Sequence, residues 1–212
     1  MTSTIEYCSL RSTTRRGAGF LPGLLLLMAL ATSSAQAQTF TTLFSLDSAS
    51  GTYSVAGLAI GPDGDLYGTA QQGGAHDLGT VFKVDSAGKL TVLYSFSGAD
   101  GAYPSAGLTF DVAGNVYGTT MLGGSANRGT VFKVGAKSEI YSFGSKHGDG
   151  TYPIAAVVVD GAGNAYGTTQ QGGAHGFGTV FKLSAAGKET ILYSFKGVPD
   201  GEYPCAGLTL DS

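Results

Sequence analysis

The chain has 212 residues with 12 basic and 15 acidic side chains, which gives a formal net charge of −3. The charges are scattered without a basic run, which argues against nucleic acid and anionic membranes as main partners but allows a neutral polysaccharide. Glycine is abundant, at 35 residues, and strand-forming Val, Tyr, Phe and Thr separate the glycines, a pattern that predicts short strands and tight turns.

Residues 1–37 are expected to be a signal peptide. Three arginines among residues 11–16 precede an apolar segment, residues 20–31, that is too short for a typical membrane span. An Ala-Gln-Ala cleavage pattern at 35–37 would start the mature chain near Gln38. The alternative is an uncleaved N-terminal anchor. The paired arginines also suggest export by the twin-arginine route, but the general secretion route is favoured. We expect an extracellular or cell-surface protein without a membrane span in its mature chain, with the periplasm as an alternative.

Removal of the signal peptide leaves residues 38–212, enough for one domain. Three arginines and Glu6 leave with it, so nine basic and fourteen acidic residues remain and the net charge is near −5. Cys205 is then the one cysteine, which rules out an intrachain disulfide in the mature product. We expect Cys205 to be a small buried residue, with a free thiol as the alternative.

One stretch of sequence occurs three times. "DLYGTAQQGGAHDLGTVFKV" begins at Asp65, and close copies surround Tyr117 and Tyr166, which follow Tyr67 at intervals of 50 and 49 residues. The shorter signatures "YSF" and Asp-Gly-x-Tyr-Pro recur with the same period. A period near 50 residues indicates a propeller or a stacked array, because each unit needs its neighbours to bury its core.

Each unit divides into four apolar runs. In the middle unit these are residues 106–111, 115–120, 129–134 and 139–143, and Gly-Asn or Gly-Asp pairs between the first two runs predict hairpins. No segment has helical periodicity, and frequent glycine weakens a helix by about 1 kcal/mol per residue. The sequence therefore predicts an all-β, β-propeller-like array of four-stranded antiparallel units of about 50 residues.

The repeat inventory is about three and a half units. Complete units span approximately 57–96, 106–143 and 155–195, a partial fourth covers 206–212, and Thr41–Leu46 matches an isolated fourth run. We expect an incomplete or open ring, a truncated or longer parent chain, or completion of the ring by self-association. By analogy with propellers, the first run of each unit would be innermost and the Asp-Gly-x-Tyr-Pro loop would connect units.

Together, "GNVYGTT", "GG…GTVFK", "LYSF" and "DGxYP" resemble the GloVer tandem repeats, bacterial exported proteins called choice-of-anchor because members carry different C-terminal surface anchors. The resemblance covers about Leu43 to Leu210. It implies a secreted or surface-displayed, propeller-like protein. It implies no established reaction, so no catalytic residue and no cofactor is carried over.

The residues that could carry chemistry are better explained by turns. His76 and His175 occupy equivalent positions, but the middle unit has Ala126 there, and no zinc-binding spacing occurs, so no metal site is expected. Asp111 and Asp160 end the first run of their units, where they would cap turns rather than bind Ca²⁺. The Gly-Gly pairs indicate a wide turn rather than a phosphate-binding loop.

A repeated polar set is the candidate ligand-binding surface. Repeat symmetry would place its members on one rim, where amides and tyrosines could bind sugars or peptides by hydrogen bonding and ring stacking. The middle unit has Met121-Leu122 in place of the glutamines, and the alternative is that the tyrosines pack between units. The candidates are Tyr67, Gln71, Gln72, Tyr166, Gln170 and Gln171.

The sequence favours an exported, non-enzymatic repeat protein that acts as a surface or extracellular binding or scaffold module. The first alternative is a propeller enzyme of the lactonase, lyase or glycosidase type whose active site lies largely in missing blades. The second is a structural repeat array. The presumed inner runs are apolar in every copy, for example "AGLTF" and "AAVVV", which argues against a catalytic channel.

Overall fold

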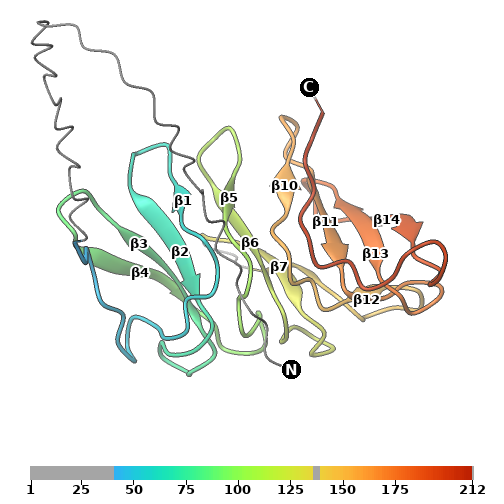
Figure 1. Ribbon diagram of the computed structural model, residues 1–212, viewed down its shortest axis with the longest axis horizontal. Coiled ribbons are helices and arrows are strands. Elements are labelled where there is room, and N and C mark those ends of the chain that lie inside the picture. Colours follow the sequence, from blue (N-terminus) through green and yellow to red (C-terminus); the bar gives the residue numbers. More distant parts are fainter. Residues whose placement is uncertain (1–40, 136–138, 212) are drawn as a thin grey trace, which may run out of the picture. The chain divides into compact units, whose positions relative to one another are not determined.

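The computed structural model describes residues 41–135 and 139–211, and every regular element in these ranges is a β-strand (Figure 1). Among these residues, no helix is long and apolar enough to cross a membrane. The predicted signal peptide and its cleavage site lie outside the described residues.

The strands form three four-stranded antiparallel sheets, each in chain order. This confirms the predicted all-β, propeller-like array of four-stranded units, and the array is open rather than closed into a ring. One pairing was not predicted: β9 (Gly150–Thr151) pairs with β12 (Gln171–Gly172) in a two-stranded sheet. The first sheet holds β1 (Ala59–Ile60), β2 (Leu66–Ala70), β3 (Thr80–Val84) and β4 (Leu90–Ser95); the second holds β5 (Thr109–Phe110), β6 (Val116–Thr120), β7 (Thr130–Lys133) and β8 (Glu139–Ser142); the third holds β10 (Val158–Val159), β11 (Ala165–Thr169), β13 (Thr179–Leu183) and β14 (Glu189–Ser194).

The hairpin between β5 and β6 shows how the Gly-Asn pair works. Asp111 N–H donates to Asn115 O at 3.1 Å, and Gly114 N–H donates to Asp111 O at 2.9 Å. Gly114 alone takes the left-handed conformation, with φ of 81°. The Asp111 carboxylate accepts from Ala113 N–H at 3.0 Å and from Asn115 Nδ2 at 2.7 Å. The prediction that this aspartate caps a turn is confirmed.

The glycine of the Tyr-Gly-Thr motif makes room for a phenylalanine on the neighbouring strand. Gly118 on β6 pairs with Phe132 on β7. A Cβ atom at Gly118 would lie 2.5 Å from Phe132 Cζ, closer than carbon atoms can approach. Gly68 and Gly167 have the same relation to the equivalent rings. The motif therefore leaves room for an aromatic ring against its own sheet.

Neighbouring sheets close each other's cores through edge-on aromatic pairs. Phe96, at the end of β4, meets Phe132 with ring centroids 5.0 Å apart, and Phe143 meets Phe181 at the same distance. The rings of Phe96 and Phe143 are fully buried. Leu46 packs against the core cluster of the first sheet, where an earlier unit would place its phenylalanine. Each sheet thus buries its face only with a neighbour, which accounts for the repetition.

A second contact recurs at each junction. A buried or half-buried threonine of the second strand donates its hydroxyl to the alanine carbonyl that opens the next unit. The three bonds are Thr69 Oγ1 to Ala106 O at 3.1 Å, Thr119 Oγ1 to Ala155 O at 3.1 Å, and Thr168 Oγ1 to Ala206 O at 3.0 Å.

The leading and trailing runs differ from the expectation in one respect. Neither Thr41–Leu46 nor residues 206–211 is a strand, because the described residues offer these runs no adjacent strand of their own unit for a hydrogen-bond ladder. They still occupy their repeat positions: Leu46 covers the first sheet, and Ala206 accepts the junction bond.

Candidate functional site

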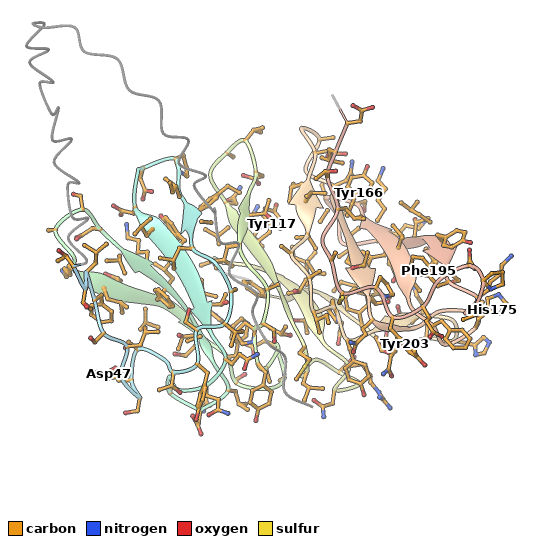
Figure 2. All side chains as sticks on the ribbon, in the orientation of Figure 1. Asp47, Tyr117, Tyr166, His175, Phe195 and Tyr203 are labelled. Atoms are coloured by element: carbon orange, nitrogen blue, oxygen red, sulfur yellow. The ribbon has the colours of Figure 1, made fainter. Side chains whose placement is uncertain are left out.

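The predicted binding residues lie at opposite ends of their strands. Tyr67 is near the start of β2, and Gln71 and Gln72 follow its end. Four residues of strand separate Tyr67 from Gln71 by about 13 Å. Tyr166 and the Gln170–Gln171 pair have the same relation on β11. In Figure 2, Tyr117 and Tyr166 lie at one end of the sheets and Tyr203 at the other. The structure therefore does not bring the tyrosines and glutamines together.

The strand tyrosines belong to a hydrogen-bonded cluster beside the first hairpin of each unit. Tyr117 OH donates to Asp111 Oδ2 at 3.1 Å, and Lys133 Nζ lies 5.3 Å from the Tyr117 ring centroid. Tyr166 repeats the arrangement with Asp160 at 3.0 Å. Hydrogen bonds from the Asn164 side chain and backbone lower the pKa of Asp160 to about 2. These tyrosines hold a hairpin, in agreement with the alternative that they serve packing.

The first unit makes the same cluster with different residues. Gly61 stands at the position of the aspartate, and Tyr67 OH donates instead to Asp63 Oδ2 at 2.8 Å. Lys83 Nζ bonds Asp65 Oδ2 at 2.7 Å. A Cβ atom at Gly61 would lie 2.4 Å from Tyr67 Cε2. The position of the Tyr67 ring, which bonds Asp63, therefore requires glycine at residue 61.

The glutamines lie on the opposite end of the sheets, which we call the amide rim. In each unit it comprises the two residues that follow the second strand. It also includes the tyrosine of the Asp-Gly-x-Tyr-Pro loop, or of its first degenerate copy, that precedes the unit. The carbonyls of Tyr53, Tyr103 and Tyr152 each accept a hydrogen bond from the first residue of the pair, at 3.0 to 3.2 Å. The members are Gln71, Gln72, Met121, Leu122, Gln170 and Gln171 with Tyr53, Tyr103, Tyr152 and Tyr203.

The loop tyrosines take a backbone conformation that aromatic residues rarely adopt. Their φ values are 56°, 56°, 59° and 53° in chain order. A bulky residue in this left-handed region costs of order 1–3 kcal/mol and persists only where its surroundings impose it. Here Tyr103 N–H donates to Leu78 O at 2.9 Å, and Tyr152 N–H donates to Arg128 O at 2.8 Å. The backbones of Tyr103 and Tyr152 thus each join two units.

The left-handed conformation of these tyrosines could not be predicted from the sequence. Three of them precede proline, which normally pushes the preceding residue toward extended conformations. The one available signal was the recurrence of Tyr at the same position of all four loops. This recurrence predicts a connection between units and does not by itself indicate a surface.

The rings of the loop tyrosines form part of the surface. Tyr152 stacks on the Arg128 guanidinium, which also donates to the Tyr152 hydroxyl, and Tyr203 meets Phe177 edge-on with centroids 5.8 Å apart. Tyr53 is 68% exposed and Tyr203 45% exposed. The amide rim therefore offers aromatic surface beside side-chain amides.

Substitutions on the rim follow the junctions between units. Gln71 Nε2 donates to Ser105 Oγ at 3.0 Å, across the first junction. The equivalent positions are Met121 and Ile154 at the second junction, an apolar pair. Cys205 occupies the position of Ser105 in the last loop, and it is exposed. The expectation of a buried cysteine is wrong, because this position faces the rim rather than a core.

The Gly-Gly turn and its histidine show no ligand-binding geometry. Gly123 and Gly124 have φ of 81° and 76°, and Asn127 Oδ1 closes the turn by accepting from Gly123 N–H at 2.9 Å. His76 and His175 are exposed on the corresponding turns. Within residues 41–135 and 139–211, no three His, Cys, Asp or Glu side chains are grouped so that they could hold a metal ion.

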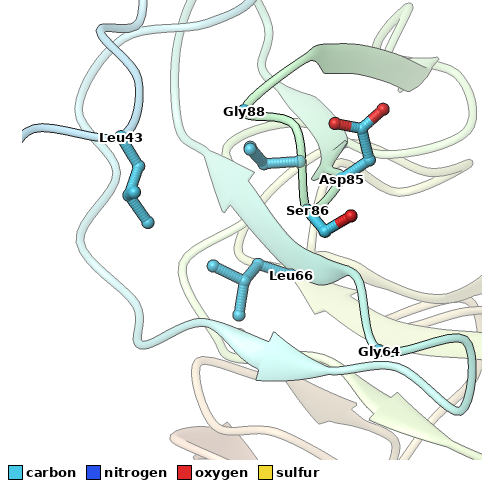
Figure 3. A pocket seen from close by; sticks show the side chains of 7 residues that line it. Leu43, Gly64, Leu66, Asp85, Ser86 and Gly88 are labelled. Carbon is cyan, nitrogen blue, oxygen red and sulfur yellow. The ribbon is translucent and has the colours of Figure 1, made fainter.

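Two small cavities occur at equivalent repeat positions. One of about 270 Å³ lies between Leu43 of the leading run and Leu66 of β2, with Asp85 and Ser86 at its edge (Figure 3). The other, of about 80 Å³, lies between Ile140 and Leu183. Both are packing gaps where a fourth run meets the next sheet, and neither touches the amide rim.

Comparison with known proteins agrees with the repeat. Residues 9–212 match the model of the Gloeobacter/Verrucomicrobia repeat. No curated protein matches the chain. One similar solved structure is an X-ray structure described as a "putative gluconolactonase", with 18% identity, a TM-score of 0.41, and coverage of 63% of this chain and 45% of that chain. This chain thus spans less than half the length of that protein. The protein belongs to the Gloeobacter/Verrucomicrobia repeat family.

Proposed function

We propose that the protein is an exported, non-enzymatic binding module whose amide rim holds neutral carbohydrate chains. The observation that carries the proposal is the set of loop tyrosines. Their backbones are left-handed in every unit, and Tyr53 and Tyr203 expose 68% and 45% of their surface. A strained backbone that presents aromatic rings at the surface is typical of functional positions.

The chemistry of the rim suits sugars. Aromatic faces stack on the apolar faces of sugar rings, and amides donate to and accept from sugar hydroxyls. Gln171 is exposed, and Gln72 and Gln170 are half-buried, so these amides can reach a ligand. With mature charge near −5, a neutral polymer is favoured over an acidic one. A chain ligand could contact several units at once, which would raise its affinity above that of a single site.

An enzymatic role has less support. The inner-run segments contribute buried apolar side chains such as Leu108 and Val157 to the cores. The turn histidines His76 and His175 are exposed, and among the described residues neither shares a hydrogen bond with a carboxylate that would orient it as a general base. Binding without turnover therefore agrees best with the side chains that are present.

A glycan array probed with the mature protein tests the proposal. We expect binding to neutral polysaccharides, weakened at least tenfold by the double change Tyr53→Ala and Tyr203→Ala. Tyr166→Phe, at the opposite end of the sheets, is the matched control and should bind as the wild type does. Absence of binding together with turnover of lactones or glycosides would establish the enzymatic alternative instead.

Export is tested separately. Production of the full chain in a bacterium with a general secretion system should yield a protein outside the cytoplasm. Its N-terminal sequence should start near Gln38 because of the Ala-Gln-Ala pattern at 35–37. Retention of Met1 on the exported protein would favour the uncleaved anchor.

A further inference from the structure

Two carboxyl groups are buried where the second and third sheets meet, beside the half-buried Tyr141 and the exposed Lys146. Tyr141 of β8 places its hydroxyl 3.1 Å from Asp149 Oδ2 and 2.9 Å from Glu189 Oε2, on β14. Lys146 Nζ lies 2.8 Å from the same Glu189 oxygen. Asp149 and Glu189 are only 5% and 7% exposed. The group therefore links β8, the loop after it and β14.

The tyrosine–aspartate bond recurs in the first and third units, where it joins Tyr94 to Asp100 and Tyr193 to Asp200. In the first sheet, however, Leu90 occupies the strand position that Glu189 holds in the third. Glu189 therefore has no carboxylate counterpart in the first sheet.

The hydrogen-bond donors in this group are too few for its acceptors. Tyr141 has one hydroxyl proton, so it can donate to Asp149 or to Glu189 but not to both. Ser145 N–H adds a donor to Asp149 Oδ2 at 3.2 Å. Asp149 Oδ1 and Glu189 Oε1 are buried with no hydrogen-bond partner. Leaving two such oxygens unpaired is costly, so a further proton between the carboxyl groups would stabilise the site.

The charge balance points the same way. Two carboxylates against one lysine leave one uncompensated negative charge in a largely buried place. Burial, with the nearby Asp149 carboxyl as a further cause, raises the pKa of Glu189. One proton makes the group neutral. A divalent cation would instead lie beside the Lys146 ammonium, which repels it.

We propose that Asp149 and Glu189 share one proton taken from solvent, so that the junction between the second and third sheets is tighter at acidic than at alkaline pH. Tyr141 and Lys146, the other ionisable groups that face the pair, both have a raised pKa and stay protonated near neutrality. An acid with a raised folded-state pKa contributes its full stability below its ordinary value of 4.5 and loses it as pH rises through the folded value.

The experiment follows unfolding of the full chain by urea between pH 4 and 8, with side-chain carboxyl resonances read by NMR. For wild type, the ratio of unfolded to folded protein should rise by up to about tenfold for each pH unit. This rise is confined to the pH range in which the folded protein holds one proton more than the unfolded chain. Glu189→Gln should remove that slope and be the more stable form at pH 8, because its amide can donate to Asp149. Glu202→Gln, which removes an exposed carboxylate, is the matched control and should keep the slope.

Two further variants distinguish proton sharing from a packing effect. Glu189→Leu, which copies the first sheet, should also lack the slope. Lys146→Met should move the inflection to higher pH, which loss of packing would not do. Parallel pH profiles for wild type and Glu189→Gln, with the Glu189 carboxyl titrating in its ordinary range, would overturn the proposal. So would stabilisation of wild type, but not of Glu189→Gln, by calcium at pH 8, because the pair would then hold a cation.

Discussion

At the scale of single residues, the repeat preserves interactions more faithfully than residue types. The acid that accepts from the strand tyrosine is Asp111 or Asp160 in two units and Asp63 in the first, where Gly61 makes space for it. An alignment that scored Gly61 as a lost aspartate would miss that the bond to Tyr67 remains. The tyrosine hydroxyl needs an acceptor, but that acceptor can come from different positions of the turn.

Asp160 gives a pH prediction with the opposite sign to that of Glu189. The pKa of Asp160 is lowered to about 2, first by the Asn164 side chain. A lowered folded-state pKa means stability that is present above 3.8 and lost as pH falls through about 2. Urea midpoints between pH 2 and 5 should therefore fall less steeply in Asp160→Asn than in wild type. Asp77→Asn is the control, because Asn127 makes the same turn bond naturally. Equal slopes in all three proteins would contradict the assignment.

The strained tyrosine conformation can be tested where the ring contributes least packing. Tyr53 has φ of 56° and is 68% exposed. Asparagine tolerates the left-handed region, so Tyr53→Asn should raise the free energy of unfolding by about 1 kcal/mol. Thermal unfolding of the two proteins measures this difference. A loss of stability would mean that packing of the Tyr53 ring stabilises the fold by more than the left-handed backbone destabilises it.

At the scale of the elements, the largest fully buried side chains meet at the junctions between sheets. The ring of Phe143 is fully buried against Phe181, so Phe143→Ala leaves a cavity and should cost about 3–5 kcal/mol in unfolding free energy. Leu46→Ala removes a partly buried side chain and should cost less. Urea unfolding compares the two. A larger loss for Leu46→Ala would mean that the leading run, not the internal junction, limits stability.

The hairpins and second-to-fourth strands could be predicted from sequence because their signals are local. Alternating apolar residues, the Gly-Asn pairs and the length change before β8 all act within one unit. The loop tyrosines could not, because their conformation is imposed by hydrogen bonds to two units, against the preference of a residue before proline. The burial of Glu189 could not be predicted either, because no local pattern in "GKETILYSF" shows that Tyr141, 48 residues away, faces it.

At the scale of the molecule, the outer face of the third sheet exposes what the other sheets bury. Leu192 and Tyr193 are 52% and 41% exposed, whereas the equivalent Leu93 and Tyr94 pack against a core cluster at the first junction. Contact with a second copy would cover these side chains, and a head-to-tail contact can form rings or open assemblies.

We therefore expect the described domain to self-associate as its concentration rises. Light scattering of wild type should show a mass that increases with concentration, and Leu192→Lys should shift the protein toward monomer. Val112→Lys is the control, because Val112 is 87% exposed on a hairpin turn away from that face. A wild type that stays monomeric at every concentration would contradict the prediction.

The junction bonds described above have a consequence for how such a protein can change over generations. A threonine hydroxyl bonds an alanine carbonyl at all three junctions, and a phenylalanine pair closes both internal cores. A unit duplicated or deleted by recombination in register would meet its new neighbours with both contacts already in place. The length of the array can therefore vary by whole units without compensating substitutions, while Glu189 shows that a junction can also bury ionisable groups.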